Sequence, residues 1–176
     1  MGIEIKIIEK MREDDINIPN EPFVLFGRMI PSYTDEKWSY TTEIFDTERE
    51  MCFPDEGYSY DELSKNHVFI GAYDGDRCVG LAILSLAYFK YMYLYDLKVN
   101  REYRRNNIGR MLIERSKEIA KAHGYNGIYT IGQDNNLAAC LFYISCGFNI
   151  GGVDTNVYKG TSQEGKSEIY FYLDCL

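Results

Sequence analysis

The segment from Tyr91 to His123 constrains the fold of this chain more than any other segment. An apolar run over Tyr91 to Val99 predicts a strand, and a polar loop rich in arginine and asparagine follows it. Beyond the loop, apolar residues recur at the spacing of a helix face: Ile108, Met111, Leu112, Ile119 and Ala122. The helix is expected to end at His123-Gly124, because glycine tolerates the left-handed conformation of a helix cap. A strand that leads through a loop into a helix gathers the free N–H groups of the helix at one point, where they can bind an anion.

The loop carries side chains suited to phosphate oxygens. Residues Tyr103 to Arg110 read Tyr-Arg-Arg-Asn-Asn-Ile-Gly-Arg. Arg104 and Arg105 offer planar guanidinium groups that match pairs of phosphate oxygens, and Gly109 lets a ligand approach the backbone closely. The loop alone is a weak signal, since a solvated basic turn before an ordinary helix has the same composition. It is neither a Walker A loop nor a dinucleotide fingerprint, because the Gly-Lys-Ser/Thr sequence and the three spaced glycines of those motifs are absent.

The other elements predict the α/β class, with a mixed central sheet of about six to seven strands flanked by helices. Strands are expected where apolar residues alternate or run between turns: Ile3–Ile7, Val68–Tyr73, Cys78–Leu86, Tyr91–Val99, Ile128–Ile131, Asn149–Tyr158 and Glu168–Leu173. The Asp74-Gly75 pair predicts a tight hairpin turn between two of these strands. A second helix is expected over 137–145, after the capping cluster Asp134-Asn135-Asn136. Residues 14–21 are expected to form a loop or short helix, and residues 23–45 to be extended or mixed.

Length, charge and cysteine content limit the classes of function. A chain of 176 residues without a Pro- or Gly-rich linker is expected to form one domain, residues 1–176. A formal charge of −8 argues against nucleic acid or an anionic membrane as the partner and favours a cationic substrate. The five cysteines have no C-x-x-C spacing and the two histidines are isolated, so neither a disulfide framework nor a metal site is expected. Without a signal peptide or a membrane-length apolar stretch, the protein is expected to be cytoplasmic.

A second group of residues, within Asn136 to Phe148, strengthens the case for a ligand site. On a helix, Asn136, Ala139 and Tyr143 share one side, so a small residue lies between an amide and a phenol. That face can admit a slender ligand with polar groups. The aromatic residues around it would, taken alone, be typical of an ordinary core. Here both groups occur in order, with a strand between them.

With both groups present, the chain resembles the GNAT superfamily of acetyl-CoA-dependent N-acetyltransferases. The resemblance implies that residues 104–109 correspond to the family's Arg/Gln-x-x-Gly-x-Gly/Ala pyrophosphate loop. It also implies that the strand Tyr91 to Val99 holds the pantetheine arm of acetyl-CoA. One position departs from the pattern, since Asn107 stands where the family usually has its first glycine. The loop is still expected to work, because asparagine tolerates a positive φ better than other non-glycine residues.

The resemblance implies roles for individual residues. Leu97 and Val99 would offer main-chain groups to the pantetheine and the acetyl carbonyl. Asn136 would contact the pantetheine, and Tyr143 would protonate the departing CoA thiolate. The implied acetyl-CoA-binding residues are Leu97, Val99, Arg104, Arg105, Asn106, Asn107, Ile108, Gly109, Arg110, Asn136, Ala139 and Tyr143.

Further segments look like those of streptothricin acetyltransferases within this superfamily: Glu21-Pro22-Phe23, 27–33, Lys37-Trp38, 133–143 and Val153-Asp154-Thr155. The likeness spans almost the whole chain. It implies a small cationic amine as substrate, namely streptothricin, whose β-lysine moiety would be acetylated, with antibiotic resistance as the result. The protein would be a monomer or a homodimer, since small sheets often leave an edge that a second copy can cover.

Acetyl transfer to an amine also needs a base that deprotonates the ammonium group. Asp96 is the first candidate, because it lies on the strand beside the expected acetyl position. Strict alternation puts Asp96 on the face opposite Tyr95 and Leu97, although a β-bulge could reverse that facing. A water molecule relayed by Tyr95, where related enzymes often have a glutamate, is the alternative.

Several other residues are candidates for the acceptor site. Glu21, Glu56 and Asp61 could hold a cationic substrate, and Tyr58-Ser59-Tyr60 could line its binding site, although each is also explained as ordinary surface. Two alternatives to streptothricin acetylation stay open. One is acetylation of another amine, such as a polyamine, an aminoglycoside or a protein amino group. The other is a non-catalytic acyl-CoA-binding module.

Overall fold

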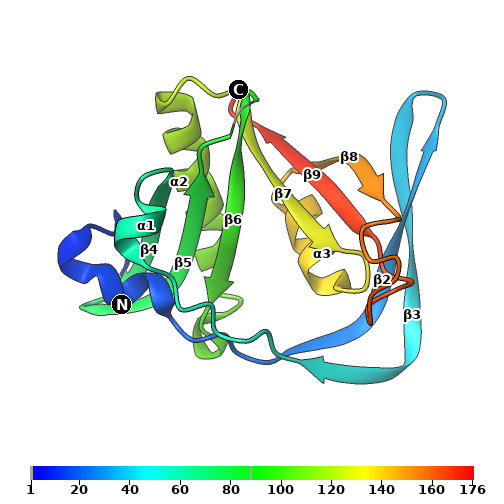
Figure 1. The fold of residues 1–176 in the computed structure, drawn as a ribbon, viewed down its shortest axis with the longest axis horizontal. Coiled ribbons are helices and arrows are strands. Elements are labelled where there is room, and N and C mark those ends of the chain that lie inside the picture. The colour runs from blue at the N-terminus through cyan, green and yellow to red at the C-terminus, as the bar shows by residue number, and fades with distance from the viewer. Residues whose placement is uncertain (1, 88) are drawn as a thin grey trace. The chain divides into compact units, whose positions relative to one another are not determined.

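The structure is a computed structural model that describes residues 2–87 and 89–176. The chain divides into two compact units. The first unit consists of Met1–Glu21, Cys52–Ile128 and Asp174–Leu176, and the second of Pro22–Met51 and Tyr129–Leu173. Nine strands occur in the described residues, and seven of them are assigned to one sheet, which confirms the predicted α/β class and strand number (Figure 1).

The first unit contains four strands of this sheet in the order β1-β4-β5-β6. Their bounds, with those of the unit's helices, are β1 (Ile3–Ile7), η1 (Lys10–Asn17), α1 (Tyr60–Leu63), β4 (His67–Asp74), β5 (Arg77–Ser85), β6 (Tyr91–Val99), η2 (Arg101–Tyr103) and α2 (Ile108–Ala122). Each neighbouring pair of strands is antiparallel. Gly75 has a φ of 60°, so the predicted turn between β4 and β5 is confirmed.

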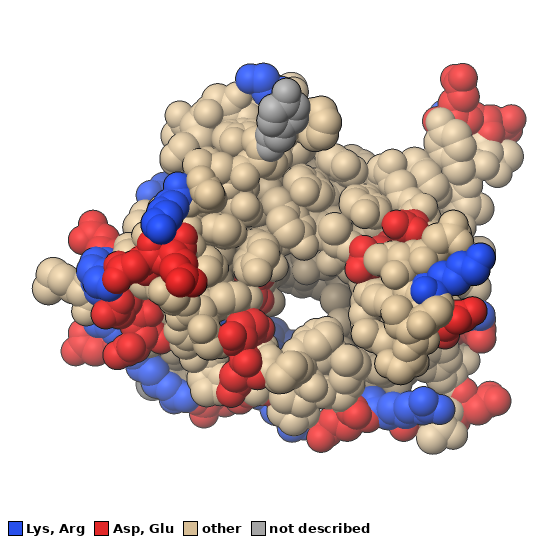
Figure 2. Space-filling view, in the orientation of Figure 1, with Lys and Arg blue, Asp and Glu red and all other residues tan. Residues whose placement is uncertain are grey.

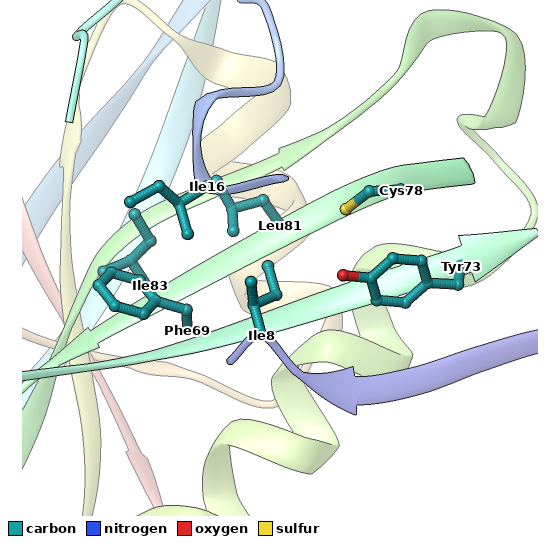
Figure 3. Packing of buried hydrophobic residues seen from close by; sticks show 7 residues of the cluster. All are labelled: Ile8, Ile16, Phe69, Tyr73, Cys78, Leu81 and Ile83. Atoms are coloured by element: carbon teal, nitrogen blue, oxygen red, sulfur yellow. The ribbon is translucent and has the colours of Figure 1, made fainter. Parts of the chain in front are cut away.

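The sheet of the first unit is covered on both faces. On one face lies an apolar cluster made of Ile8, Ile16, Phe69, Tyr73, Cys78, Leu81 and Ile83, whose side chains meet in Figure 3. Burial of each large aliphatic side chain in such a cluster stabilises the fold by about 1.5–3 kcal/mol. On the other face α2 approaches β5 closely. A Cβ atom at Gly80 would lie 3.1 Å from Ile108 and 3.3 Å from Leu112, so the glycine allows this contact.

The buried side of α2 differs in part from the predicted one. Ile108, Leu112 and Ile119 are buried as predicted, but Ala122 is exposed at the last turn. The helix also buries Ile113, Ser116 and Ala120, whose spacing of three and four residues forms a second stripe beside the predicted one, so the buried side is broader than predicted. Gly124 has a φ of 78° directly after the helix, so the predicted stop is confirmed.

The second unit contains a long hairpin and the other sheet strands. Its elements are β2 (Phe23–Thr34), β3 (Lys37–Met51), α3 (Leu137–Ser145), β8 (Asn149–Asp154) and most of β7 (Gly127–Gln133) and β9 (Glu168–Asp174), with β7-β9-β8 as the sheet order. The segment 23–45, predicted as extended or mixed, is extended, and β3 continues to Met51. Asp35 and Glu36 form the turn with φ values of 52° and 61°. Figure 2 shows acidic side chains at this end of the hairpin.

Two predicted boundaries in the chain were wrong. The strand expected over 149–158 ends at Asp154, because the Asp154 carboxylate accepts hydrogen bonds from the N–H groups of Asn156 and Val157 and turns the chain. The helical segment expected within 14–21 is η1, which already begins at Lys10.

No helix in the described ranges has the length and apolar character that would let it cross a membrane.

Candidate functional site

The loop between β6 and α2 has the backbone shape that an anion site requires. Arg105 and Asn107 both adopt positive φ, at 64° and 63°. Asn107 is the N-cap residue of α2 and takes the left-handed conformation, with ψ at 5°. The expectation that asparagine tolerates this conformation in place of glycine is therefore confirmed.

Three contacts hold this loop within the first unit. Arg104 Nε donates to the Val99 carbonyl oxygen at 3.0 Å, which ties the loop to the end of β6. Tyr103 donates its hydroxyl hydrogen to Asp74 Oδ2 at 2.8 Å. The Arg101 N–H donates to Glu21 Oε2 at 2.5 Å, so this carboxylate supports the loop backbone.

The start of α2 suits a negatively charged group. The Asn107 side chain makes no capping hydrogen bond to the helix, and the first turn contains no acidic residue. The N–H groups of this turn therefore keep the positive end of the helix dipole, about half a unit charge. The side chains of Arg104, Arg105, Asn106 and Arg110 are exposed around it, while Ile108 is buried and fixes the helix to the sheet. A diphosphate fits the charge and the donors of this loop.

A β-bulge interrupts β6 beside the predicted base. Ile83 of β5 pairs with Asp96, but the next residue, Leu84, pairs with Leu94, so Tyr95 is the extra residue. Asp96 keeps the face opposite Leu97, as alternation predicts. Tyr95 does not keep the face opposite Asp96, since Tyr95 and Asp96 both contact Tyr58.

Asp96 lies in a group of polar side chains of the first unit. Its Oδ2 accepts a hydrogen bond from the Tyr58 hydroxyl at 3.2 Å and lies 3.3 Å from Lys98 Nζ. Lys98 Nζ also lies 2.9 Å from Glu56 Oε2 and donates to Asn20 Oδ1 at 3.3 Å. The side chains of Lys98 and Asp96 are only 11% and 15% exposed. This polar group links β6 to the segment that precedes α1.

Burial raises the pKa of Asp96 above its ordinary value, and the charge of Glu56 adds to that rise, while Lys98 and Tyr58 oppose it. Burial acts in the same direction on Glu56, but hydrogen bonds from Asn20 and Lys98 outweigh it and lower the pKa of Glu56. The surroundings of the Lys98 ammonium group therefore shift the pKa values of these two carboxyl groups in opposite directions, upward for Asp96 and downward for Glu56.

Aromatic rings surround the exposed side of this group. Tyr95 is 44% exposed, and its ring centroid lies 5.9 Å from those of Tyr58 and Tyr93 and 5.1 Å from that of His67. Tyr60, also expected near the acceptor, instead packs on Phe69 and donates to the Ile8 carbonyl oxygen. Tyr60 is thus half-buried against the apolar cluster of the first unit.

The other predicted ligand residues lie on α3 in the second unit. Asn136 Oδ1 accepts a hydrogen bond from the Ala139 N–H at 3.3 Å, so Asn136 caps α3 as the sequence predicts. Tyr143 is half-buried, with its ring centroid 5.5 Å from Phe148 and 5.4 Å from Phe171. These two rings fix the orientation of the phenol.

A hollow of about 520 Å³ lies next to the start of α3, and its size is in the range of small-molecule sites. It is lined by Leu25, Glu43, Ile44, Phe45, Asp46, Thr47, Arg49 and Asn135. The hollow opens where β3 bulges, because Leu25 pairs with Arg49 whereas Gly27 pairs with Ile44. Sequence reasoning missed it, since nothing in the sequence marks this bulge.

The structure brings Leu97, Val99, Asp96 and residues 104–110 together in the first unit, and Asn136, Ala139 and Tyr143 together in the second. Asp61 lies apart from the Asp96 group and pairs with Lys10 at 2.7 Å. Sequence reasoning missed Lys98 and Asn20. A lysine inside an apolar strand was the available signal for Lys98. Within the ranges described, no three or more His, Cys, Asp and Glu residues are placed to hold a metal ion.

Known proteins of one family are similar to this chain. The family model described as Acetyltransferase (GNAT) family matches residues 34–148. Streptothricin acetyltransferase A of Bacillus subtilis (strain 168) is 34% identical over 160 residues, which cover 90% of this chain and 92% of that protein.

Two solved structures are similar over the full length. A candidate streptothricin acetyltransferase from Bacillus anthracis, solved in complex with acetyl coenzyme A, has 30% identity and a TM-score of 0.88, with 98% of this chain and 99% of that chain covered. A nourseothricin acetyltransferase has a TM-score of 0.80 at 20% identity, with both chains fully covered, and shows that the fold is shared.

Proposed function

Because the chain belongs to the acetyltransferase (GNAT) family, we propose that it transfers the acetyl group of acetyl-CoA to a primary amine of streptothricin, in the β-lysine moiety. The product would be an acetylated antibiotic, and the cell would gain resistance to it. The choice of streptothricin as substrate rests on the 34% identity to Streptothricin acetyltransferase A of Bacillus subtilis over 90% of the chain. We further propose that residues 1–176 act as one acetyltransferase domain in the cytoplasm, where acetyl-CoA is available.

In this proposal the loop before α2 binds the diphosphate of acetyl-CoA. Positive φ at Asn107 supports the assignment, as does the uncapped helix start with its exposed arginines. Leu97 and Val99 of β6 would offer main-chain groups to the pantetheine and the acetyl carbonyl. On α3, Asn136 keeps its side-chain NH₂ group for the same ligand, because its own oxygen caps the helix. The bound donor supplies an activated thioester to this site.

Asp96 would remove a proton from the acceptor ammonium group. A carboxylate is a weak base in water, and burial makes it a stronger one by raising its pKa. The neutral amine would then form the new N–C bond while the C–S bond breaks, and the nitrogen would release its remaining extra proton to solvent, from which the Tyr143 oxygen regains a proton after each turnover. Tyr143 would give its hydroxyl proton to the departing sulfur, and the packing of its ring on Phe148 and Phe171 supports that fixed role.

The experiment is incubation of the purified protein with acetyl-CoA and streptothricin, followed by mass spectrometry of the antibiotic. A product heavier by one acetyl group is expected. A panel of other amines, monitored by release of the CoA thiol, separates streptothricin from a polyamine, an aminoglycoside or a protein amino group as the preferred acceptor. Saturation at low concentration identifies that acceptor.

A further inference from the structure

The exposed side of β6 combines aromatic rings with a carboxylate in one place. Tyr95 projects from the bulge with its ring 5.9 Å from Tyr58, and Tyr58 itself donates a hydrogen bond to Asp96. The ring of Tyr93 lies 5.9 Å from Tyr95. Aromatic faces attract cations, and a partly desolvated carboxylate adds a full charge to that attraction. The combination is chemically suited to an alkylammonium group.

The charges of this region leave room for a second cation. Glu56 and Asp96 share the single ammonium group of Lys98, so the group carries one net negative charge. Both contacts of Asp96 are made by Oδ2. Within the described part of the chain, Asp96 Oδ1 makes no hydrogen bond, and it is not among the side-chain atoms sealed from solvent without a partner. It can therefore accept an N–H from outside.

The ammonium group of Lys98 is bound in this region by oxygen atoms and lies near an aromatic ring. Its Nζ contacts two carboxylates and an amide oxygen, and it lies 6.0 Å from the centroid of the Tyr58 ring. The same ring reaches Asp96 and Tyr95. The exposed side of Asp96 therefore offers an external ammonium group what Lys98 has inside, namely a carboxylate oxygen and tyrosine rings.

We infer that Tyr58, Tyr93, Tyr95 and Asp96 form the binding site for the ammonium group of the acceptor, and that Tyr95 is its main determinant of affinity. The ligand class is a primary alkylammonium group at the end of a flexible chain. The inference rests on the proposed function, since the same carboxylate then takes the proton from this ammonium group. Tyr95 binds and positions the group and takes no part in proton transfer.

Steady-state kinetics of Tyr95→Leu with streptothricin and acetyl-CoA test this inference. Loss of the ring is expected to raise the KM for the amine about twofold to thirtyfold, the range expected for a cation on an aromatic face. The KM for acetyl-CoA should stay constant. Tyr95→Phe keeps the ring and should recover most of the loss. Tyr33→Leu removes an exposed tyrosine of the second unit and is the matched control, with no change expected.

Direct binding separates failure of this inference from failure of the proposed function. Calorimetric titration with 1,5-diaminopentane should show tighter binding to the wild-type protein than to Tyr95→Leu, whether or not streptothricin is acetylated. If the wild-type protein acetylates no amine but binds the diamine through Tyr95, the proposed reaction is wrong and the binding site stands. Equal affinity of the two proteins, or equal KM values for the amine, would overturn the inference. Thermal unfolding checks that every variant is folded.

Discussion

Lys98 Nζ lies 3.3 Å from Asp96 Oδ2, and the two side chains are largely buried together on the same face of β6. Asp96 nevertheless has a raised pKa, because burial and the charge of Glu56 outweigh the effect of Lys98. The lysine thus opposes a larger rise in the pKa of the proposed base. The balance among these three charges should set the pH range of activity.

Replacement of Lys98 by methionine removes this opposing charge and puts an uncharged side chain of similar length in its place. The pKa of Asp96 should rise further, so the acid limb of the kcat profile should move to higher pH. Activity measured at a series of pH values checks the shift. Lys117→Met removes a half-buried lysine of α2 that pairs with Glu114, and it is the matched control with no expected shift. An unchanged profile in Lys98→Met would remove Lys98 from this role.

Asp96→Asn should slow acetyl transfer by about a hundredfold or more, since a positioned base contributes about 10²–10⁴ in rate. Binding of acetyl-CoA should be unaffected. Turnover under saturating amine and the affinity for acetyl-CoA are the two measurements. A rate within a few-fold of wild type would favour a water relayed by Tyr95 as the base.

The same substitution predicts a pH dependence of stability. Because the folded state raises the pKa of Asp96, it binds this proton more tightly than the unfolded state does. The resulting stabilisation is fully present below the unfolded pKa and is lost as pH rises through the folded pKa. Denaturant unfolding of wild type and Asp96→Asn across pH 3 to 8 should therefore show the variant gaining relative stability as pH rises. A difference independent of pH contradicts this prediction.

Tyr143→Phe keeps the ring that packs on Phe148 and Phe171 but removes the hydroxyl group. If Tyr143 protonates the thiolate, kcat should fall by about 10²-fold or more while acetyl-CoA binds as before. Turnover and equilibrium binding of CoA distinguish chemistry from affinity. An unchanged kcat would show that another group supplies the proton.

Asn107→Val places a β-branched residue in the left-handed conformation at the start of α2. Strain of about 1–2 kcal/mol should appear in the free energy of unfolding, and the KM for acetyl-CoA should rise because the loop loses its shape. Asn107→Gly tolerates this conformation and should show a much smaller effect on both quantities. Equal KM values for the two variants would mean that the loop does not bind the donor.

Periodic patterns in the sequence predict most of the regular structure. The strand and helix on either side of residues 103–110 follow from apolar runs. The sequence indicated only that Asn107 could tolerate a positive φ, and the structure shows that it adopts one. The β2–β3 hairpin was harder to predict, because its turn uses Asp35 and Glu36 instead of glycine, and Pro31 interrupts the strand pattern. A hairpin without its usual turn residues is recognisable only from its pairing.

The polar group around Asp96 could be predicted only in part. Asp96 itself stands out as an acidic residue on an apolar strand. Its facing relative to Tyr95 depends on the bulge, which strict alternation cannot anticipate. The folded chain brings Lys98 into contact with Glu56 and Asn20, which precede it by 42 and 78 positions in the sequence. No local sequence pattern predicts contacts over such separations.

We propose that the protein acetylates streptothricin with Asp96 as the base and Tyr143 as the acid. Mass spectrometry of streptothricin after incubation with acetyl-CoA and the purified protein tests it most directly. The wild-type protein should add one acetyl group to the β-lysine moiety, and the Asp96→Asn and Tyr143→Phe variants should add little or none. Absence of the acetylated product with the wild-type protein at saturating concentrations of both substrates would contradict it.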